Sequence, residues 1–214
     1  MAALLLSGAA FAQPSLTDPL IRKAAAFSGA PGAQLRRPGP AGHGEPLLAQ
    51  TYETHQLLER AARIAEARAT EPEVRAWARR LRRDHAFAAS KALSTSRKLG
   101  MNLSGAVEYL RQRVAQPEAA DDGAYGPQTR AVRELRAELR ALRKLEGRAF
   151  DARFVELMLA AHQSEVRRLT DGLAEIPLPA LSKLLGRQLR VLEQHVALGD
   201  VVLEDLRGPE WPRP

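Results

Sequence analysis

The stretch that decides the fold is TEPEVRAWARRLRRDHAFAASKA, residues 70–92. Thr70-Glu71-Pro72-Glu73 has the S/T-x-x-E form of a capping box, with a proline in the first turn, where its missing N–H costs nothing. Apolar side chains then recur every three or four residues, which predicts one buried stripe along a helix. That stripe also contains His85. Gly100, after two cations, suits the left-handed C-terminal cap of such a helix.

The same spacing predicts further helices on either side. Three are long, over about 46–69, 151–174 and 179–206, and two are shorter, over about 104–114 and 128–146. Gly147 is expected to break the second short helix. Two helical hairpins joined by a longer connection predict an all-α fold, an antiparallel four-helix bundle with extra short connecting helices.

The first 45 residues have a different character. Residues 1–12 resemble a secretory signal peptide, because an apolar run ends in the small-x-small sequence Ala10-Phe11-Ala12. Residues 13–45 are rich in proline and glycine, which predicts a flexible linker. The predicted organisation is thus a signal peptide, a linker, a bundle over 46–207 and a tail over 208–214. We expect a location in the periplasm or elsewhere in the cell envelope.

Composition excludes several functional classes. The 214 residues include no cysteine, which rules out disulfides, thiolate catalysis, iron–sulfur clusters and covalently attached haem. The net charge is +7, but the arginines alternate with acids along the helices, so we expect no nucleic-acid binding. At most weak contact with anionic membrane surfaces or polyanions is expected. No Ser–His–Asp or phosphate-loop pattern indicates an enzymatic activity.

Four histidines fall one on each long helix: His55, His85, His162 and His195. The last three lie within apolar stripes and should face the bundle interior. At 1.5 Å per residue, all four lie roughly 20–27 Å from the turns of their hairpins, which is near mid-helix. We therefore expect them in one layer, and inward-facing residues at one level are how bundles build metal sites.

Carboxylates near these histidines extend the list of candidate ligands. Glu59 follows His55 by four residues and Glu165 follows His162 by three, so each shares a helix face with a histidine. The candidate metal ligands are thus His85, His162, His195, His55, Glu59 and Glu165, and the metal would be zinc, copper or iron. Asp84 should instead pair with Arg80 or act on the site indirectly. The Glu-x-x-His pattern of di-iron centres is absent.

A structural role is the alternative interpretation of these histidines. A histidine on an apolar stripe is commonly a hydrogen-bonded core residue, so four at one level also fit a buried polar layer. On that interpretation the protein is a non-catalytic structural or interaction module of the cell envelope.

Three parts of the chain carry a resemblance to a known family. They are residues 65–78 followed by Asp84-His85, residues 145–155 continuing to His162, and the proline-led last helix with His195. Together they resemble the bacterial domain-of-unknown-function family 4142. The resemblance spans roughly residues 50–205 and implies a ferritin-like bundle, an envelope location and no established activity. It places the family's motif histidines at His85, His162 and His195.

Overall fold

The computed structural model describes residues 44–116 and 126–208, and within these ranges all regular structure is helical. The all-α prediction is therefore confirmed. The predicted signal peptide (1–12), nearly all of the predicted linker (up to 43) and residues 209–214 of the predicted tail lie outside the described residues. The helices are α2 (Gly44–Arg68), α3 (Pro72–Lys98), α4 (Leu103–Ala115), α5 (Gly126–Leu142), α6 (Gly147–Leu173) and α7 (Pro179–Arg207).

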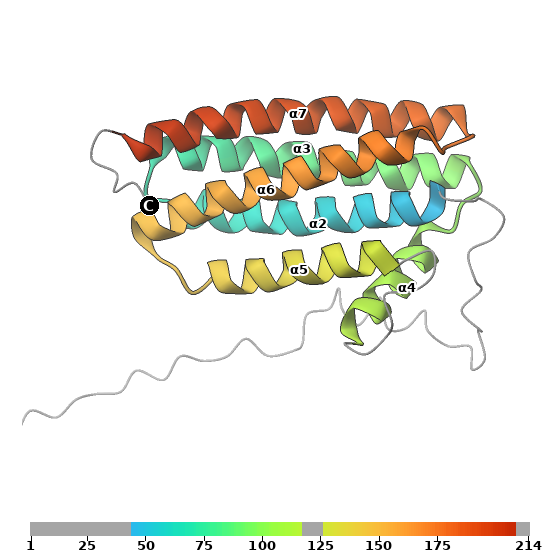
Figure 1. Ribbon diagram of the computed structural model, residues 1–214, viewed down its shortest axis with the longest axis horizontal. Helices are drawn as coiled ribbons and strands as arrows, with labels where there is room; N and C mark the ends of the chain where they lie inside the picture. Colours follow the sequence, from blue (N-terminus) through green and yellow to red (C-terminus); the bar gives the residue numbers. More distant parts are fainter. Residues whose placement is uncertain (1–43, 117–125, 209–214) are drawn as a thin grey trace, which may run out of the picture. The chain divides into compact units, whose positions relative to one another are not determined.

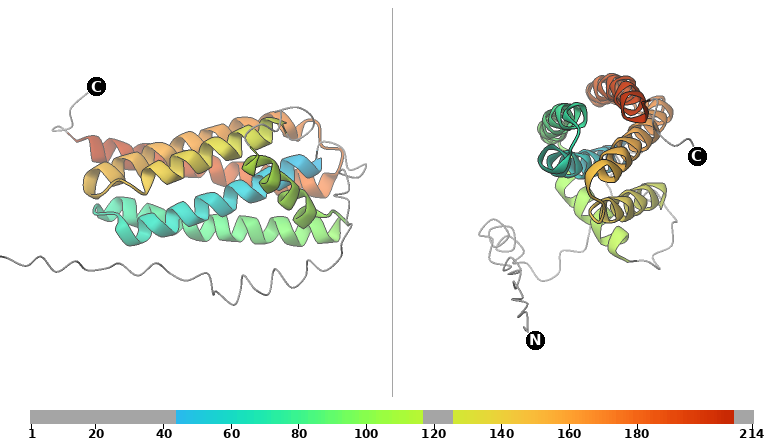
Figure 2. Two further views of the ribbon diagram at one scale, coloured as in Figure 1. Left: turned by 90° about the horizontal axis from the view of Figure 1, so that it is seen from below. Right: turned by 90° about the vertical axis from the view of Figure 1, so that its left-hand side faces the viewer.

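Two long helical hairpins form the bundle. Figure 1 shows α2 antiparallel to α3 and α6 antiparallel to α7, while α5, which connects the two hairpins in sequence, runs along the outside of the bundle. The end-on view in Figure 2 places α4 and α5 on one side of the bundle, while α3 and α7 lie on the opposite side. Among the described helices, none covers the face made by α3 and α7.

The apolar core is divided into two clusters. One contains Leu48, Leu110, Leu169, Leu181 and Leu192. The other, toward the α2–α3 turn, contains Leu58, Leu81, Phe154, Met158 and Val202. On α3, α6 and α7 the buried histidine separates residues of one cluster from residues of the other, and on α2 the change of cluster comes just after His55, between Leu57 and Leu58. The sequence expectation that the four histidines share one level is thereby confirmed.

The start of α3 differs from the predicted capping box. Glu71 is the N-cap residue and its side chain makes no capping hydrogen bond. The backbone N–H groups of Thr70 and Glu71 instead donate to the carboxylate of Asp151, each at 2.9 Å, and the Thr70 hydroxyl donates to it as well. Asp151 comes from α6 and is fully buried. The cap of α3 is therefore supplied by another helix, which ties the two hairpins together.

The connection between α5 and α6 also differs from expectation. We predicted a helix through Glu146 and a start of the next one near Asp151, whereas α5 ends at Leu142 and α6 begins at Gly147. Gly147 has a φ of 56°, a left-handed conformation that glycine adopts without strain. Arg68 donates to the carbonyl groups of Arg143 and Leu145, so these groups have partners outside a helix.

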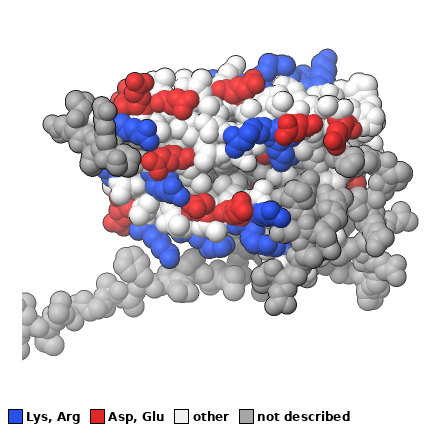
Figure 3. All heavy atoms as spheres, in the orientation of Figure 1, with Lys and Arg blue, Asp and Glu red and all other residues white. Residues whose placement is uncertain are grey.

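The surface carries both signs of charge. On the face drawn in Figure 3, lysine and arginine alternate with aspartate and glutamate. Glu53 of α2 is buried and forms ion pairs with Arg111 of α4 and Arg136 of α5. Among the described helices, none is long and apolar enough to cross a bilayer.

Candidate metal centre

The four helices of the bundle each contribute one histidine to a single buried cluster. His55 comes from α2, His85 from α3, His162 from α6 and His195 from α7, and each is at most 2% exposed. Neighbouring rings lie 5.1 to 5.3 Å apart between centroids. The sequence prediction that these histidines meet is confirmed.

Three of the four rings converge on one another. One ring nitrogen each from His85, His162 and His195 lies within 4.8 Å of the other two. His162 Nε2 lies 3.2 Å from His85 Nε2 and 3.2 Å from His195 Nδ1. Two nitrogens bound to one tetrahedral metal ion at 2.0–2.1 Å would lie roughly 3.3 Å apart. The two spacings measured from His162 Nε2 therefore fit a shared metal ion.

Hydrogen bonds on the outer sides of the His162 and His195 rings show which nitrogen of each ring carries the proton. His162 Nδ1 donates to the Met158 carbonyl oxygen, which can only accept. His195 Nε2 donates to Asp84 Oδ2 at 3.0 Å. A neutral imidazole carries one N–H, so His162 Nε2 and His195 Nδ1 both present lone pairs. These two acceptors face each other with no proton between them, and a bound cation would satisfy both.

Burial keeps the rings neutral. Desolvation lowers the pKa of His162 to about 3 and that of His55 to about 4, and it holds the pKa of His85 well below its ordinary value. Desolvation also lowers the pKa of His195, although the Asp84 carboxylate opposes that effect. At neutral pH the cluster therefore lacks the extra proton that could bridge His162 and His195. Neutral imidazole is the form that binds metals.

His55 stands behind His85. Its Nδ1 lies 2.9 Å from His85 Nδ1, so a proton on His85 Nδ1 would be accepted by His55 and would leave His85 Nε2 free to bind. With its own proton on Nε2, His55 would need an acceptor; that atom makes no hydrogen bond of ordinary geometry, but the Gln188 side chain is close enough to raise the pKa of His55. Gln188 Oε1 is also buried and without a partner. The arrangement gives His55 the role of orienting His85.

Asp84 contacts the cluster from outside the group of converging nitrogens. Its Oδ2 accepts from His195 Nε2 and lies 3.6 Å from Arg80 Nε. A carboxylate on the far nitrogen of a metal-ligating histidine fixes the tautomer and makes the ring a stronger ligand. The pairing of Asp84 with Arg80 is confirmed, whereas its contact with His195, on a different hairpin, could not be inferred from spacing.

The two glutamates proposed from the sequence are each held by an arginine, although the Glu165 carboxylate is close enough to raise the pKa of His55. Glu59 pairs with Arg63 at 2.6 Å. Glu165 is buried and pairs with Arg168, which also donates to Thr51. Neither belongs to the group of converging ligand atoms. Each arginine follows its glutamate by three or four residues, a spacing that by itself predicts an ion pair on one helix face. The sequence therefore indicates that arginine competes with a metal ion for these carboxylates.

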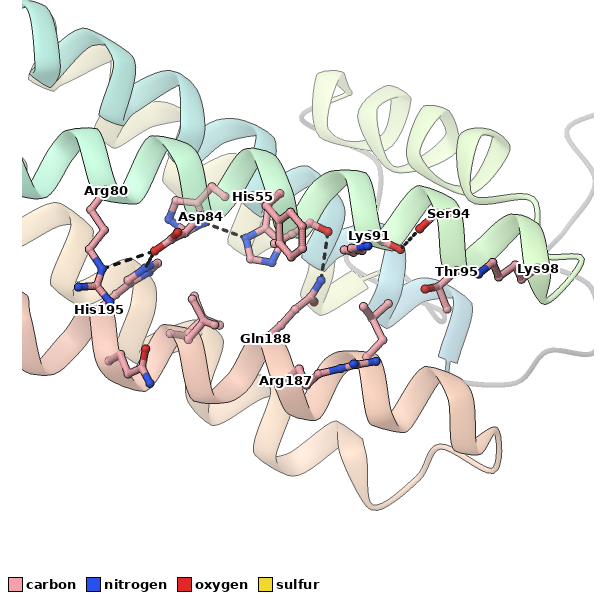
Figure 4. Close-up of a pocket in the computed structure, with 17 residues that line it drawn as sticks. His55, Arg80, Asp84, Lys91, Ser94, Thr95, Lys98, Arg187, Gln188 and His195 are labelled. Carbon is pink, nitrogen blue, oxygen red and sulfur yellow. Dashed lines mark hydrogen bonds and ion pairs between the residues drawn. The ribbon is translucent and has the colours of Figure 1, made fainter.

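A pocket opens beside the cluster between α3 and α7. Its volume is about 570 Å³, and His85, His195 and His55 lie at its inner wall whereas His162 does not. Figure 4 shows Asp84 and His195 toward one end and Thr95 and Lys98 toward the other. The cluster is therefore buried yet adjacent to a space that small molecules can enter.

Comparison with known proteins identifies the family to which the chain belongs. Searches of curated proteins and of solved structures found no match. A family model described as "Domain of unknown function (DUF4142)" matches residues 30–200. That range contains all four long helices except the end of α7, and it includes the whole histidine cluster. The chain therefore belongs to the DUF4142 family and is a helical member with a buried three-histidine group that could hold a metal ion.

Proposed function

We propose that this protein binds one divalent transition-metal ion through His85, His162 and His195. The observation that carries the proposal is the pair of facing lone pairs on His162 Nε2 and His195 Nδ1, which lie 3.2 Å apart. Each ring is held from behind by an acceptor, and buried unpaired nitrogens are costly. A metal ion at this point would satisfy them together.

The donor set favours zinc or copper over iron. Three imidazoles are a recognised zinc ligand set, and imidazole also suits copper. Iron sites in helical bundles rely on several carboxylates, and the converging group in the described residues contains none. Within the range of zinc, copper and iron expected from the sequence, we therefore expect zinc or copper to bind most tightly.

The fold and location are part of the same proposal. Two antiparallel hairpins joined by one long crossover through α5 support a ferritin-like bundle. The signal-like residues 1–12 support an exported, envelope-located protein. Fractionation of cells expressing the full chain and a version lacking residues 1–12 tests the location. Recovery of both in the same cytoplasmic fraction would contradict it.

Metal analysis of protein purified without a histidine tag tests the binding. We expect one zinc or copper per chain after incubation and dialysis, and less than a tenth of that for a His85→Ala/His162→Ala variant. Glu59→Gln and Glu165→Gln serve as matched controls, because their carboxylates pair with arginines outside the converging group; each should retain full stoichiometry. Absence of bound metal in the unmodified protein would refute the proposal.

A structural polar layer is the second candidate. It is favoured by hydrogen-bond distances that link His55 to His85 and His85 to His162, and by the position of the layer between two apolar clusters. The two candidate functions predict different effects of metal on the thermal stability of the protein. A ligand present at 100 times its Kd adds about 2.7 kcal/mol, which raises Tm by roughly 5–10 °C for a domain of this size. A structural layer predicts no change with metal or chelator.

A further inference from the structure

The pocket between α3 and α7 has a marked excess of positive charge. Its lining includes four cations, Arg80, Lys91, Lys98 and Arg187, but only one carboxylate, that of Asp84. Asp84 is already engaged by His195 and Arg80. Within the described part of the chain, Lys91, Lys98 and Arg187 form no ion pair. A pocket of this kind attracts anions, more strongly still beside a bound divalent cation.

The pocket also has an apolar wall. Leu184 and Leu192 are buried within it, and Phe87 and Val191 stand at its rim, 63% and 36% exposed. Small-molecule sites are typically concave spaces of about 300–1,000 Å³ that combine apolar walls with a few polar groups. The volume of about 570 Å³ falls within that range. An inorganic anion would leave most of this wall in contact with water.

One buried polar group faces the pocket without a partner. Gln188 lines the pocket and is 6% exposed; its Nε2 donates to the Ala88 carbonyl, while its Oε1 has no hydrogen-bond partner. Figure 4 shows Gln188 reaching from α7 toward α3, while Arg187 lies along α7. A buried acceptor left unpaired is unfavourable, so an ordered water that donates to it would be stabilised here; a carboxylate, which only accepts, would sit away from this oxygen and toward the cations.

We infer that this pocket binds a small organic carboxylate with an apolar body. The inference rests on the proposed metal site, because the carboxylate would occupy the coordination position that three histidines leave free. His85 and His195 line the pocket and His162 does not, so a fourth ligand would approach from the pocket side. Lys91 and Arg187 attract the carboxylate, and the leucine wall holds its body.

Cobalt(II)-loaded full-length protein allows a direct test, because the visible absorption of cobalt reports its coordination. Titration with benzoate should change the spectrum, with a Kd at least fivefold lower than that for acetate, which lacks the ring. Inorganic phosphate should bind no better than acetate. The variant Lys91→Gln/Arg187→Gln should weaken benzoate about tenfold, since two attracting charges are removed.

A matched control separates local from overall charge. The variant Arg83→Gln/Arg190→Gln removes two exposed cations from the same two helices outside the pocket, and it should change benzoate affinity less than twofold. If cobalt binds but benzoate leaves its spectrum unchanged, or if both double variants weaken benzoate equally, the inference is wrong while the metal site stands. If no cobalt binds, the proposed function and this inference both fail.

Discussion

His162 Nε2 and His195 Nδ1 lie 3.2 Å apart at the centre of the bundle, and neither can donate a hydrogen bond to the other. The proton of His162 is used at the Met158 carbonyl and that of His195 at Asp84. The two rings come from adjacent helices of one hairpin, so their approach is built into the α6–α7 turn. This relationship makes the cluster a stronger metal candidate than four buried histidines in general.

Asp84→Asn should weaken metal binding without abolishing it. The carboxylate accepts from His195 Nε2 at 3.0 Å, and loss of such a partner typically costs 10–100-fold in metal affinity. Competition with a chelator of known affinity measures the change. Asp200→Asn, an exposed change on α7, is the control and should leave affinity unaltered. Equal affinity of Asp84→Asn and the parent protein would show that Asp84 does not orient a ligand.

His55→Gln should separate orientation from coordination. If His55 only accepts from His85 Nδ1, the variant still binds one metal per chain but with affinity reduced about 10–100-fold. His162→Gln should instead lose stoichiometric binding. Metal content and competition titrations on both variants give the comparison. Complete loss of metal in His55→Gln would identify His55 as a direct ligand.

Acid should destabilise the metal-free protein in a defined window. The folded pKa values of His55 and His162 are about 4 and about 3, below the ordinary value of 6.5. As pH falls below 6.5, the unfolded chain binds protons that the folded chain excludes, so stability that is complete above 6.5 is lost toward pH 4.

Within that window, each of these two histidines should lower the free energy of unfolding by about 1.4 kcal/mol for every unit by which the pH falls. Urea denaturation at pH 7 and pH 5.5 should therefore show a loss of roughly 2–3 kcal/mol from the pair. A His55→Gln/His162→Gln variant should show a correspondingly smaller loss. The same pH dependence in both proteins would contradict the assignment to these histidines.

Asp151→Ala should destabilise the bundle by about 2–3 kcal/mol, because it leaves three donors at the start of α3 without their acceptor. Chemical denaturation measures the loss. Asp171→Ala, an exposed change on the same helix, should stay within about 0.5 kcal/mol of the parent protein. A small effect of Asp151→Ala would mean that water replaces the carboxylate at the cap.

Two glycines of α7 should respond oppositely to alanine. A Cβ at Gly199 would lie 2.7 Å from side-chain atoms of Leu159 and Trp77, whereas one at Gly186 would meet nothing within 4 Å. Gly199→Ala should therefore destabilise by about 1–3 kcal/mol, and Gly186→Ala should stabilise by about 0.5–1 kcal/mol. Thermal melts of both variants measure the direction and size of each change in stability. A shift of the same sign in both would contradict the packing around Gly199.

The sequence was sufficient for the helices and for the level of the histidines, because both depend on local spacing. Periodicity located α3 and α7 closely, and the constant rise per residue aligned His85 with His162. The capping of α3 was not predictable, since Asp151 lies 81 residues from Thr70 in the chain. The contact between Asp84 and His195 depends likewise on how two hairpins pack. The helix-face criterion that predicts Glu59 and Glu165 as ligands takes no account of Arg63 and Arg168, which pair with them instead.

The polar layer between two apolar clusters also bears on how the helices find their alignment during folding. A shift of α6 by one turn, 5.4 Å, would drive His162 against leucines and set an apolar side chain among the remaining imidazoles. Every such misaligned state buries polar nitrogens without partners, which is unfavourable. The histidines therefore favour one axial alignment of the four helices over the shifted ones, and a metal ion bound to them would stabilise that alignment further.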